Sequence, residues 1–413
     1  MLRLIGPFTQ LLPLGQLPAK GPISDDHLVV IEQGGLVVEG ERIVAVGVFA
    51  DLQKRFSAAQ VERIMEPMVA MPGLIDAHTH ICFGGSRAMD FAARNGGKTY
   101  LEIAAAGGGI WSTVQHTRAA SQQELCQLTT DRLDTLLRRG VTTVEVKSGY
   151  GLSVEQELKQ LRAIRQSAQE HQCDVVATCL AAHMKPRDFE GTAEEYLQHI
   201  LQELVPVVKA EGLAQRFDIF IEQSAFTAEQ AAPYLQAVKA LGFELTVHGD
   251  QFTVGGSAVA AECGALSVDH LEVSGPAEAE MLAQTDTIPV VLPGATMGLG
   301  CDWGKARLML DAGCALAIAS DWNPGSAPHG NLIAQAGLLA AFESLSTAEV
   351  FAGMTERAAR ALGLNDRGVL EADKLADVIA FSTKDYREVL YQQGNLLPAR
   401  VWKKGVLVRS VLQ

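Results

Sequence analysis

The sequence predicts an α/β fold, a (β/α)8 TIM-type barrel with a small β-sandwich domain built from both termini. Three observations support this prediction. Short apolar runs alternate with helical stretches in the middle of the chain, β-branched residues and glycine turns occupy both ends, and polar side chains recur where the apolar runs stop. Near-continuous Val/Ile/Leu runs joined by helices are typical of parallel strands buried on both faces.

The residue pattern at the two ends of the chain is typical of a small β-sheet. At 413 residues the chain exceeds the usual size of one domain, so we expect a large domain and a smaller one. Strand-like segments, separated by turns such as Gly34-Gly35, occupy residues 28–33, 36–39, 42–48, 377–381 and 401–409. We therefore predict a composite small domain from residues 1–70 and 375–413, and a barrel over residues 71–374.

Eight apolar runs, each ending in polar or small residues, fill the barrel region. They are residues 73–80, 142–150, 175–183, 217–222, 245–250, 266–272, 288–294 and 315–321. Helical stretches lie between them, such as 122–139, 154–169 and 194–211. Eight such units in a row favour a closed barrel. A doubly wound open sheet is the alternative that the pattern alone leaves open.

Polar side chains mark the ends of the predicted strands, where a barrel of this type carries its catalytic groups. In chain order these ends hold His78 with His80, Tyr150, His183, Glu222, His248 with Asp250, His270, and Asp321. Five of the ten histidines of the chain fall at such positions. Chance placement would scatter them, so we expect one shared site.

His78 and His80 are two residues apart on a predicted strand, so their side chains point to the same face. Converging imidazoles suit a metal such as zinc or iron, although exposed His-x-His pairs without a metal are common. His248 and Asp321 complete a plausible ligand set. A carboxylate at a buried strand end is costly unless it is paired or bound to metal, although residues 320–325 could be only an Asx-capped turn. A metal-bound water is a good nucleophile, and a neighbouring carboxylate can take its proton.

Other strand-end and loop residues have two interpretations each. His270 is a further ligand or a donor to a developing oxyanion, or else a core histidine bonded to Asp269. Tyr150 and His183 could hydrogen-bond a polar ligand. Arg87, on the first strand-to-helix loop, suits a carboxylate substrate or is a solvated arginine. The run at 107–109 is glycine only, which favours a tight backbone near the site over a phosphate cradle.

Composition excludes several classes of protein. The net charge of −14 argues against nucleic-acid binding, because phosphate neutralisation needs a basic face. Seven cysteines with no Cys-x-x-Cys pair favour reduced thiols in a cytoplasmic protein. Pro7 and Pro13 interrupt the first fourteen residues, so we expect neither a signal peptide nor a membrane span.

These residues resemble the amidohydrolase superfamily and, more closely, the imidazolonepropionase family of histidine degradation. The resemblance runs through essentially the whole chain. The segments that carry it are residues 73–80, 83–87, 100–110, 145–152, 248–251, 269–272 and 320–326.

The resemblance implies both a site and a reaction. The implied ligands of one divalent or trivalent metal ion, zinc or iron, are His78, His80, His248 and Asp321. The implied substrate-binding residues are Arg87, Tyr150, His183, Gln251, Asn323, Gly325 and Ser326. The implied substrate is a small anionic imidazolone, 4-imidazolone-5-propanoate. Its ring amide is hydrolysed to N-formimidoyl-L-glutamate, with metal-bound water as the nucleophile, Asp321 and His270 as catalytic residues, and a homodimer as the assembly.

Departures from related families keep two alternatives open. Related deaminases carry glutamate three residues after the histidine of the fifth strand, whereas this chain has Gln251, which cannot transfer protons. A deaminase or formimino-hydrolase is therefore the alternative reaction, and a non-catalytic binding protein is the alternative class. Glu222 lies where two-metal relatives place a bridging group, and residues 295–303 and 327–330 are less typical of the family.

Overall fold

The barrel predicted from the sequence is present in the computed structural model, which describes residues 1–99, 102–103 and 106–410. Its eight parallel strands pair in the order in which they follow one another along the chain. They are β6 (Leu74–Asp76), β7 (Val141–Lys147), β8 (Asp174–Ala182), β9 (Arg216–Ile219), β10 (Glu244–Gly249), β11 (Ser267–His270), β12 (Ile288–Val291) and β13 (Ala317–Ile318). A doubly wound sheet reverses its strand order at a switch point, so this sequential order excludes that alternative.

The barrel closes between its first and last strands, just beyond the ends of β6 and β13. Thr79 forms a parallel bridge with Trp322. The N–H of Asp321 donates to the carbonyl of His78 at 3.0 Å. The N–H of His80 donates to the carbonyl of Trp322 at 2.9 Å. The closing seam therefore brings the predicted ligands of the first strand beside the predicted ligand of the last.

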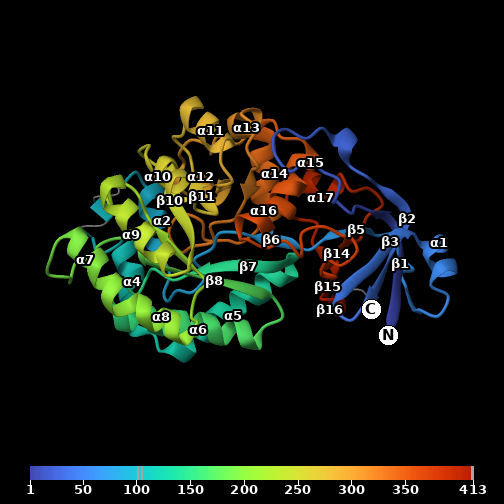
Figure 1. Ribbon diagram of the computed structural model, residues 1–413, viewed down its shortest axis with the longest axis horizontal. Helices are drawn as coiled ribbons and strands as arrows, with labels where there is room; N and C mark the ends of the chain where they lie inside the picture. The colour runs from blue at the N-terminus through green and yellow to red at the C-terminus, as the bar shows by residue number, and fades with distance from the viewer. Residues whose placement is uncertain (100–101, 104–105, 411–413) are drawn as a thin grey trace.

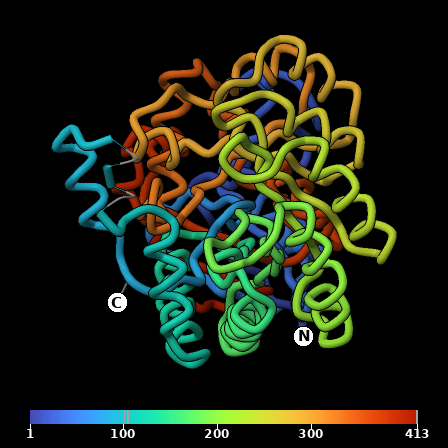
Figure 2. The backbone as a smooth tube through the Cα atoms, turned by 90° about the vertical axis from the view of Figure 1, so that its left-hand side faces the viewer, coloured from blue at the N-terminus to red at the C-terminus, as the bar shows by residue number. Residues whose placement is uncertain are grey.

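Helices connect the strands and surround the barrel (Figures 1 and 2). They are α2 (Ala88–Asn95), α4 (Ile110–Ala119), α5 (Gln122–Arg138), α6 (Val154–Glu170), α7 (Ala193–His199), α8 (Val205–Glu211), α9 (Ala228–Ala240), α10 (Gly256–Cys263), α11 (Pro276–Ala283), α12 (Pro293–Leu299), α13 (Ala306–Asp311), α14 (Leu332–Glu343), α15 (Thr347–Gly353) and α16 (Glu356–Ala361). A capping box starts α5, because Ser121 and Glu124 each accept the other's backbone N–H. In the described parts of the chain, no helix is long and apolar enough to cross a membrane.

The predicted helix at 194–211 is not one continuous α-helix. A π-helical turn at Ile200–Leu204 separates α7 from α8. Pro206 lies at the start of α8 and has no N–H to donate to the preceding turn. The wider turn before it accommodates this missing hydrogen bond, so the helix changes pitch at this point.

Both ends of the chain form the small β domain, which lies beside the barrel in Figure 1. One eight-stranded sheet has the order β16-β15-β14-β5-β1-β2-β3, with β4 paired to β1. Its strands are β1 (Leu2–Leu11), β2 (Ile31–Glu39), β3 (Arg42–Val48), β4 (Gln60–Arg63), β5 (Val69–Pro72), β14 (Val378–Phe381), β15 (Pro398–Lys403) and β16 (Val406–Ser410). Residues from both β2 and β15 belong to one buried cluster, among them Leu36 and Trp402, so the sheet curls around this core. The predicted composite domain is confirmed, and its exact boundaries stay a prediction.

Two details of this domain differ from the sequence prediction. Gly34 and Gly35 lie inside β2 and not in a turn. A β-carbon at Gly34 would lie 2.5 Å from Cβ of Leu11, so these glycines serve the close approach of β1 and not a reversal of the chain. β1 has no counterpart among the predicted strands, because Pro7 falls at an irregularity in its register and obscures the alternation.

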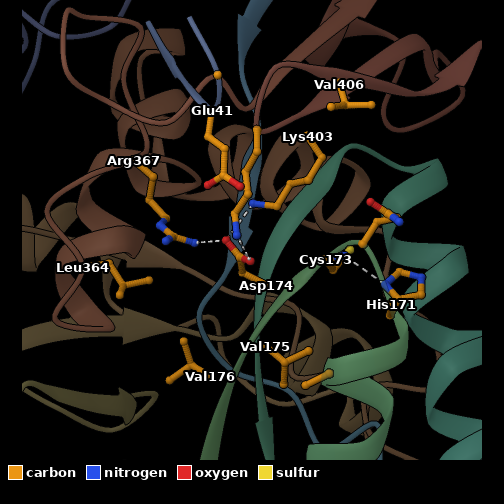
Figure 3. A pocket seen from close by; sticks show the side chains of 14 residues that line it. Glu41, His171, Cys173, Asp174, Val175, Val176, Leu364, Arg367, Lys403 and Val406 are labelled. Carbon is orange, nitrogen blue, oxygen red and sulfur yellow. Dashed lines mark hydrogen bonds and ion pairs between the residues drawn. The ribbon is translucent and has the colours of Figure 1, made fainter.

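A seam of ion pairs joins the small domain to the N-terminal end of the barrel. A cavity of about 770 Å³ lies there, at the start of β8. Arg367, from the segment after α16, and Lys403, from β15, point at Asp174 (Figure 3), at 2.6 and 2.8 Å. Lys403 also pairs with Asp377 at 2.5 Å. Because these cations already have carboxylate partners, we assign the seam to domain attachment; the predicted site residues lie at the opposite end of the strands.

Candidate metal centre

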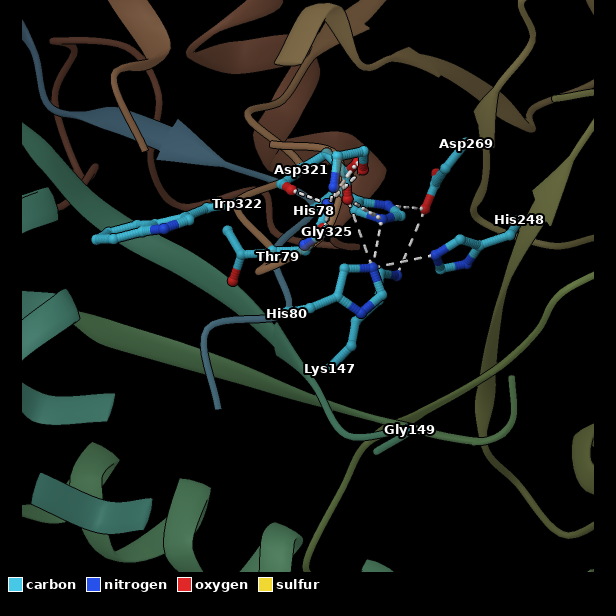
Figure 4. Close-up of polar contacts among 12 residues, drawn as sticks. His78, Thr79, His80, Lys147, Gly149, His248, Asp269, Asp321, Trp322 and Gly325 are labelled. Atoms are coloured by element: carbon cyan, nitrogen blue, oxygen red, sulfur yellow. Dashed lines mark hydrogen bonds and ion pairs between the residues drawn. The ribbon is translucent and has the colours of Figure 1, made fainter. Parts of the chain in front are cut away.

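Three imidazoles converge at the C-terminal end of the barrel, as Figure 4 shows. Nε2 of His80 lies 3.1 Å from Nε2 of His78 and 3.2 Å from Nε2 of His248. Oδ1 of Asp321 lies 3.5 Å from Nε2 of His78 and 3.6 Å from Nε2 of His80. All four side chains are buried. The structure thus brings together the four residues that the sequence singled out as ligands.

The chemistry of this donor set suits a cation. Nδ1 of His78 lies 2.6 Å from Oδ2 of Asp269, and Nδ1 of His248 lies 2.8 Å from Oδ2 of Asp218. A carboxylate only accepts, so each Nδ1 carries the proton and each Nε2 presents a lone pair to the centre. Lone pairs gathered with a carboxylate oxygen repel one another unless a cation lies between them. Imidazole and carboxylate are ligands that both zinc and iron accept.

The turn after β13 holds Asp321. The backbone of Asp321 has a φ of 52°, a left-handed conformation that is uncommon for a residue with a side chain. Oδ2 of Asp321 accepts from Nδ2 of Asn323 at 2.9 Å and from Oγ of Ser326 at 3.3 Å. Oδ1 of Asn323 accepts the backbone N–H of Gly325 and of Ser326. The turn is therefore Asx-capped and also orients Asp321, so both interpretations of this segment apply together. Contact of Asn323, Gly325 and Ser326 with a substrate stays a prediction.

His270 pairs with Glu272, whose Oε1 lies 3.3 Å from its Nδ1. The alternative of a core histidine bonded to Asp269 is wrong, because Asp269 contacts His78. Burial alone lowers the pKa of His270, but the Glu272 carboxylate outweighs it and raises the pKa above its usual value. The ring centroid of His270 lies 5.4 Å from that of His248. The Glu272 carboxylate thus favours the protonated form of His270, which is the form that can donate a hydrogen bond or a proton.

Two predicted substrate residues, Tyr150 and His183, flank the imidazole cluster. The ring of His183 stacks on His80 with centroids 5.5 Å apart, and the ring of Tyr150 lies 6.0 Å from His80. Nδ1 of His183 lies 3.1 Å from the carbonyl oxygen of Gly149 and donates to it. Burial lowers the pKa of His183 to about 4. His183 is therefore neutral near pH 7, and its Nε2, which has no hydrogen-bond partner among the residues that the structure describes, can accept a ligand N–H.

Glu157 on α6 holds the loop that carries Tyr150, a role that the sequence did not reveal. Its carboxylate accepts the backbone N–H groups of Gly149, Gly151 and Leu152 at 3.1, 2.7 and 2.7 Å. Leu152 has a φ of 52°, so the loop is held in a conformation that it would not adopt alone.

Glu157→Gln is expected to raise KM about tenfold with a smaller change in kcat, an order of magnitude typical of leaving buried N–H groups unsatisfied. The amide offers one acceptor oxygen where the carboxylate offers two, and its NH2 group faces backbone donors. Steady-state kinetics measure the effect. Glu155→Gln, an exposed position on the same helix, serves as the matched control. Equal KM values for both variants would contradict the proposed role of Glu157.

Arg87 lies at the start of α2 and contacts the turn that carries Asp321. A β-carbon at Gly325 would lie 2.5 Å from Nη1 of Arg87, so the guanidinium lies close against this glycine. Nε of Arg87 donates to Asp90 at 2.8 Å, and Asp90 also accepts the N–H of Gly109 at 2.8 Å. This contact supports the interpretation of residues 107–109 as a tight backbone near the site. Within the segment 100–110, residues 100, 101, 104 and 105 lie outside the described residues.

Gln251 and Glu222 lie at neighbouring strand ends with different surroundings. Gln251 is buried in the turn after β10. The carboxylate of Glu222 accepts the N–H groups of Phe252 and Thr253 at 2.9 and 3.1 Å and a further hydrogen bond from the Thr253 hydroxyl. Among the described residues, three side-chain groups could hold a metal, and Glu222 belongs to none of them. Its contacts give Glu222 the role of anchoring the turn.

Beneath the imidazoles lies a buried ion cluster that the sequence did not single out. Nζ of Lys147 lies 2.8 Å from Glu145, 2.8 Å from Asp218 and 3.4 Å from Asp269. Burial alone lowers the pKa of Lys147, but the three carboxylates outweigh it and raise the pKa above its usual range. Lys147 is therefore an ammonium. The available signal was a charged residue inside each of several apolar strand runs.

Comparisons with known proteins identify relatives of the whole chain. The amidohydrolase family matches residues 69–408, and the bacterial imidazolonepropionase-like composite domain matches residues 34–56. Imidazolonepropionase of Symbiobacterium thermophilum is 41% identical over 97% of this chain and 95% of its own length. That of Erwinia tasmaniensis is 42% identical over 91% and 93%. That of Deinococcus radiodurans is 41% identical over 94% and 95%.

Solved structures share the fold at lower sequence identity. An adenosine deaminase from Xanthomonas campestris with bound zinc has a TM-score of 0.72 at 20% identity, covering 98% of this chain and 92% of that one. An atrazine chlorohydrolase from Arthrobacter aurescens, complexed with zinc, has a TM-score of 0.72 at 18% identity, covering 99% and 96%. These likenesses show the fold, and the sequence relatives decide among its many functions. The chain belongs to the amidohydrolase family and, within it, to the imidazolonepropionases.

Proposed function

We propose that this chain hydrolyses the ring amide of 4-imidazolone-5-propanoate to N-formimidoyl-L-glutamate, using one zinc or iron ion. The proposed ligands are His78, His80, His248 and Asp321. The observation that carries this proposal is the convergence of three imidazole Nε2 atoms and one carboxylate oxygen at the closing seam of the barrel. The imidazolonepropionases of Symbiobacterium thermophilum and Erwinia tasmaniensis, matched over 95% and 93% of their lengths, support the same substrate.

The reaction adds water to the ring carbonyl carbon and breaks the bond from that carbon to the ring nitrogen, which takes up a proton. A metal held by this donor set lowers the pKa of water toward neutrality and polarises a carbonyl oxygen. We assign to Asp321 the acceptance of the proton of the attacking water. We assign to His270, whose protonated form is favoured by Glu272, the donation of a hydrogen bond to the oxyanion that develops on the carbonyl oxygen.

The substrate side chain and ring need groups that fix their orientation. Arg87 offers a guanidinium beside the metal centre of a protein whose net charge of −14 repels anions. We assign it to the propanoate carboxylate. Tyr150, His183 and Gln251 are assigned to the polar atoms of the ring. The neutral His183 accepts an N–H of the substrate through Nε2.

In the test, urocanase generates the unstable substrate in the same reaction mixture as this protein. The loss of the imidazolone absorbance is followed. Metal-replete protein is expected to accelerate that loss and to produce N-formimidoyl-L-glutamate in equal amount. Unchanged decay would refute the proposed substrate. Release of ammonia from a purine, pyrimidine or formimidoyl compound would assign the chain to the alternative reaction.

Arg87→Met is expected to raise KM by about 10- to 100-fold with little change in kcat, because a charge-assisted contact to the carboxylate is made in the ground state and the transition state alike. The urocanase-coupled assay at varied substrate concentration measures both constants. Arg94→Met, on the same helix but stacked on Phe91, is the control. If Arg87→Met lowered kcat and left KM unchanged, the assignment of Arg87 to the propanoate would be wrong.

A further inference from the structure

The carboxylates that pair with Nδ1 of His78 and Nδ1 of His248 share one cation, the ammonium of Lys147. Oδ2 of Asp269 contacts Nδ1 of His78 at 2.6 Å and Nζ of Lys147 at 3.4 Å. Oδ2 of Asp218 contacts Nδ1 of His248 at 2.8 Å and the same Nζ at 2.8 Å. Each carboxylate oxygen that orients a ligand is therefore also bound by Lys147.

The ion pairs of the Lys147 ammonium all lie within this buried cluster. An ammonium has three N–H donors, and three carboxylates surround this one, the third being Glu145 at 2.8 Å. All four side chains of this cluster are fully buried, so bulk solvent does not screen their charges: Lys147, Glu145, Asp218 and Asp269. A buried ion cluster of this kind is a costly way to fill a core, because apolar residues of similar volume often stabilise a protein as well or better.

The backbone places Lys147 directly under the ligands. Its N–H, at the end of β7, donates to the carbonyl of Thr79, the residue between His78 and His80, at 2.9 Å. The hydroxyl of Thr79 donates to the carbonyl of Glu145 at 2.5 Å. Figure 4 shows dashed lines from the carboxylate of Asp269 to both His78 and Lys147.

We propose that Lys147 is a positioning residue of the metal centre: its ammonium holds Asp218 and Asp269 so that they fix His248 and His78 with Nε2 toward the metal. His80 differs from these two ligands: Nδ1 of His78 and Nδ1 of His248 each pair with a carboxylate, whereas among the described residues no carboxylate pairs with Nδ1 of His80. Lys147 therefore orients two of the three imidazoles, His78 and His248, through their carboxylate partners. It rests on the metal site of the proposed function.

Lys147→Met is expected to weaken metal binding 10- to 100-fold, the usual effect of disturbing partners of metal ligands. Chelator competition measures the zinc dissociation constant, and the visible spectrum of the cobalt-loaded protein reports the ligand geometry. Lys403→Met is the matched control, because Lys403 is a buried lysine between two carboxylates at the opposite end of the barrel. This control is expected to lose a similar amount of thermal stability while its zinc affinity stays within about threefold of wild type.

Different results would refute the role of Lys147 and the proposed metal-dependent function. Equal zinc affinities and identical cobalt spectra for wild type and Lys147→Met would overturn the role of Lys147. A wild-type protein that binds no metal at all would instead refute the proposed function. If Lys147→Met does not fold, long-range ¹H–¹⁵N spectra of the metal-free wild type decide: Nδ1–H tautomers of His78 and His248 are expected. Nε2–H tautomers would overturn the proposal.

Discussion

His248→Ala is expected to lower kcat/KM by about 10⁴-fold, which corresponds to the several kcal/mol that a metal ion contributes to charge stabilisation. His248 is one of the three imidazoles of the donor set, with its Nε2 3.2 Å from that of His80. Its loss opens one side of the site and leaves Asp218 without its imidazole partner. Metal content per chain is therefore expected to fall along with activity.

Elemental analysis of the purified variant and the urocanase-coupled assay measure the two losses together. His27→Ala is the control, because His27 is exposed and lies in the connection between β1 and β2. Chelation of the wild type is expected to produce the same loss of activity, and zinc or iron(II) to restore it. A fully metal-loaded and active His248→Ala protein would contradict the ligand assignment and favour a non-catalytic role for the barrel.

Asp321→Asn is expected to lower kcat by about 10³-fold, within the usual range for the loss of a general base. Asparagine has the same shape and tolerates the left-handed backbone of this position, where φ is 52°. The fold and the turn with Asn323 are therefore expected to survive. What is lost is the negative charge beside His78 and His80 and the ability to take a proton.

Single-turnover kinetics on metal-saturated protein separate two effects of the substitution: the loss of proton transfer and the weakening of metal binding. The control is Asp373→Asn, since Asp373 is exposed, remote from the site and also left-handed, with a φ of 67°. Its kinetics are expected to match wild type. If metal-saturated Asp321→Asn retained wild-type kcat, the proton would have to pass through another group, and His270 would be the next residue to test.

The fold could be predicted because its signals are local. Buried parallel strands are apolar on both faces, so the eight runs were visible one by one, and short connections left little freedom in how they join. Local signals failed where a long-range contact decides the structure. Gly34 is inside a strand because Leu11 approaches it from β1, and nothing within a few residues of Gly34 shows that approach.

The sequence by itself determined which strand ends carry chemistry, because side chains two residues apart share a face and a barrel gathers its strand ends. His78, His80, His248 and Asp321 followed from this rule, and the structure brings them together. Only the tertiary structure decided how these groups are oriented.

The partner of His78 is Asp269, 191 residues further along the chain. Lys147 likewise meets Asp218 through a contact between strands, 71 residues apart in the chain. Which oxygen meets which nitrogen depends on barrel closure and register, to within a few tenths of an ångström. Residue types and spacing carry no information at that scale, which is why the ligands could be read from the sequence and their supports could not.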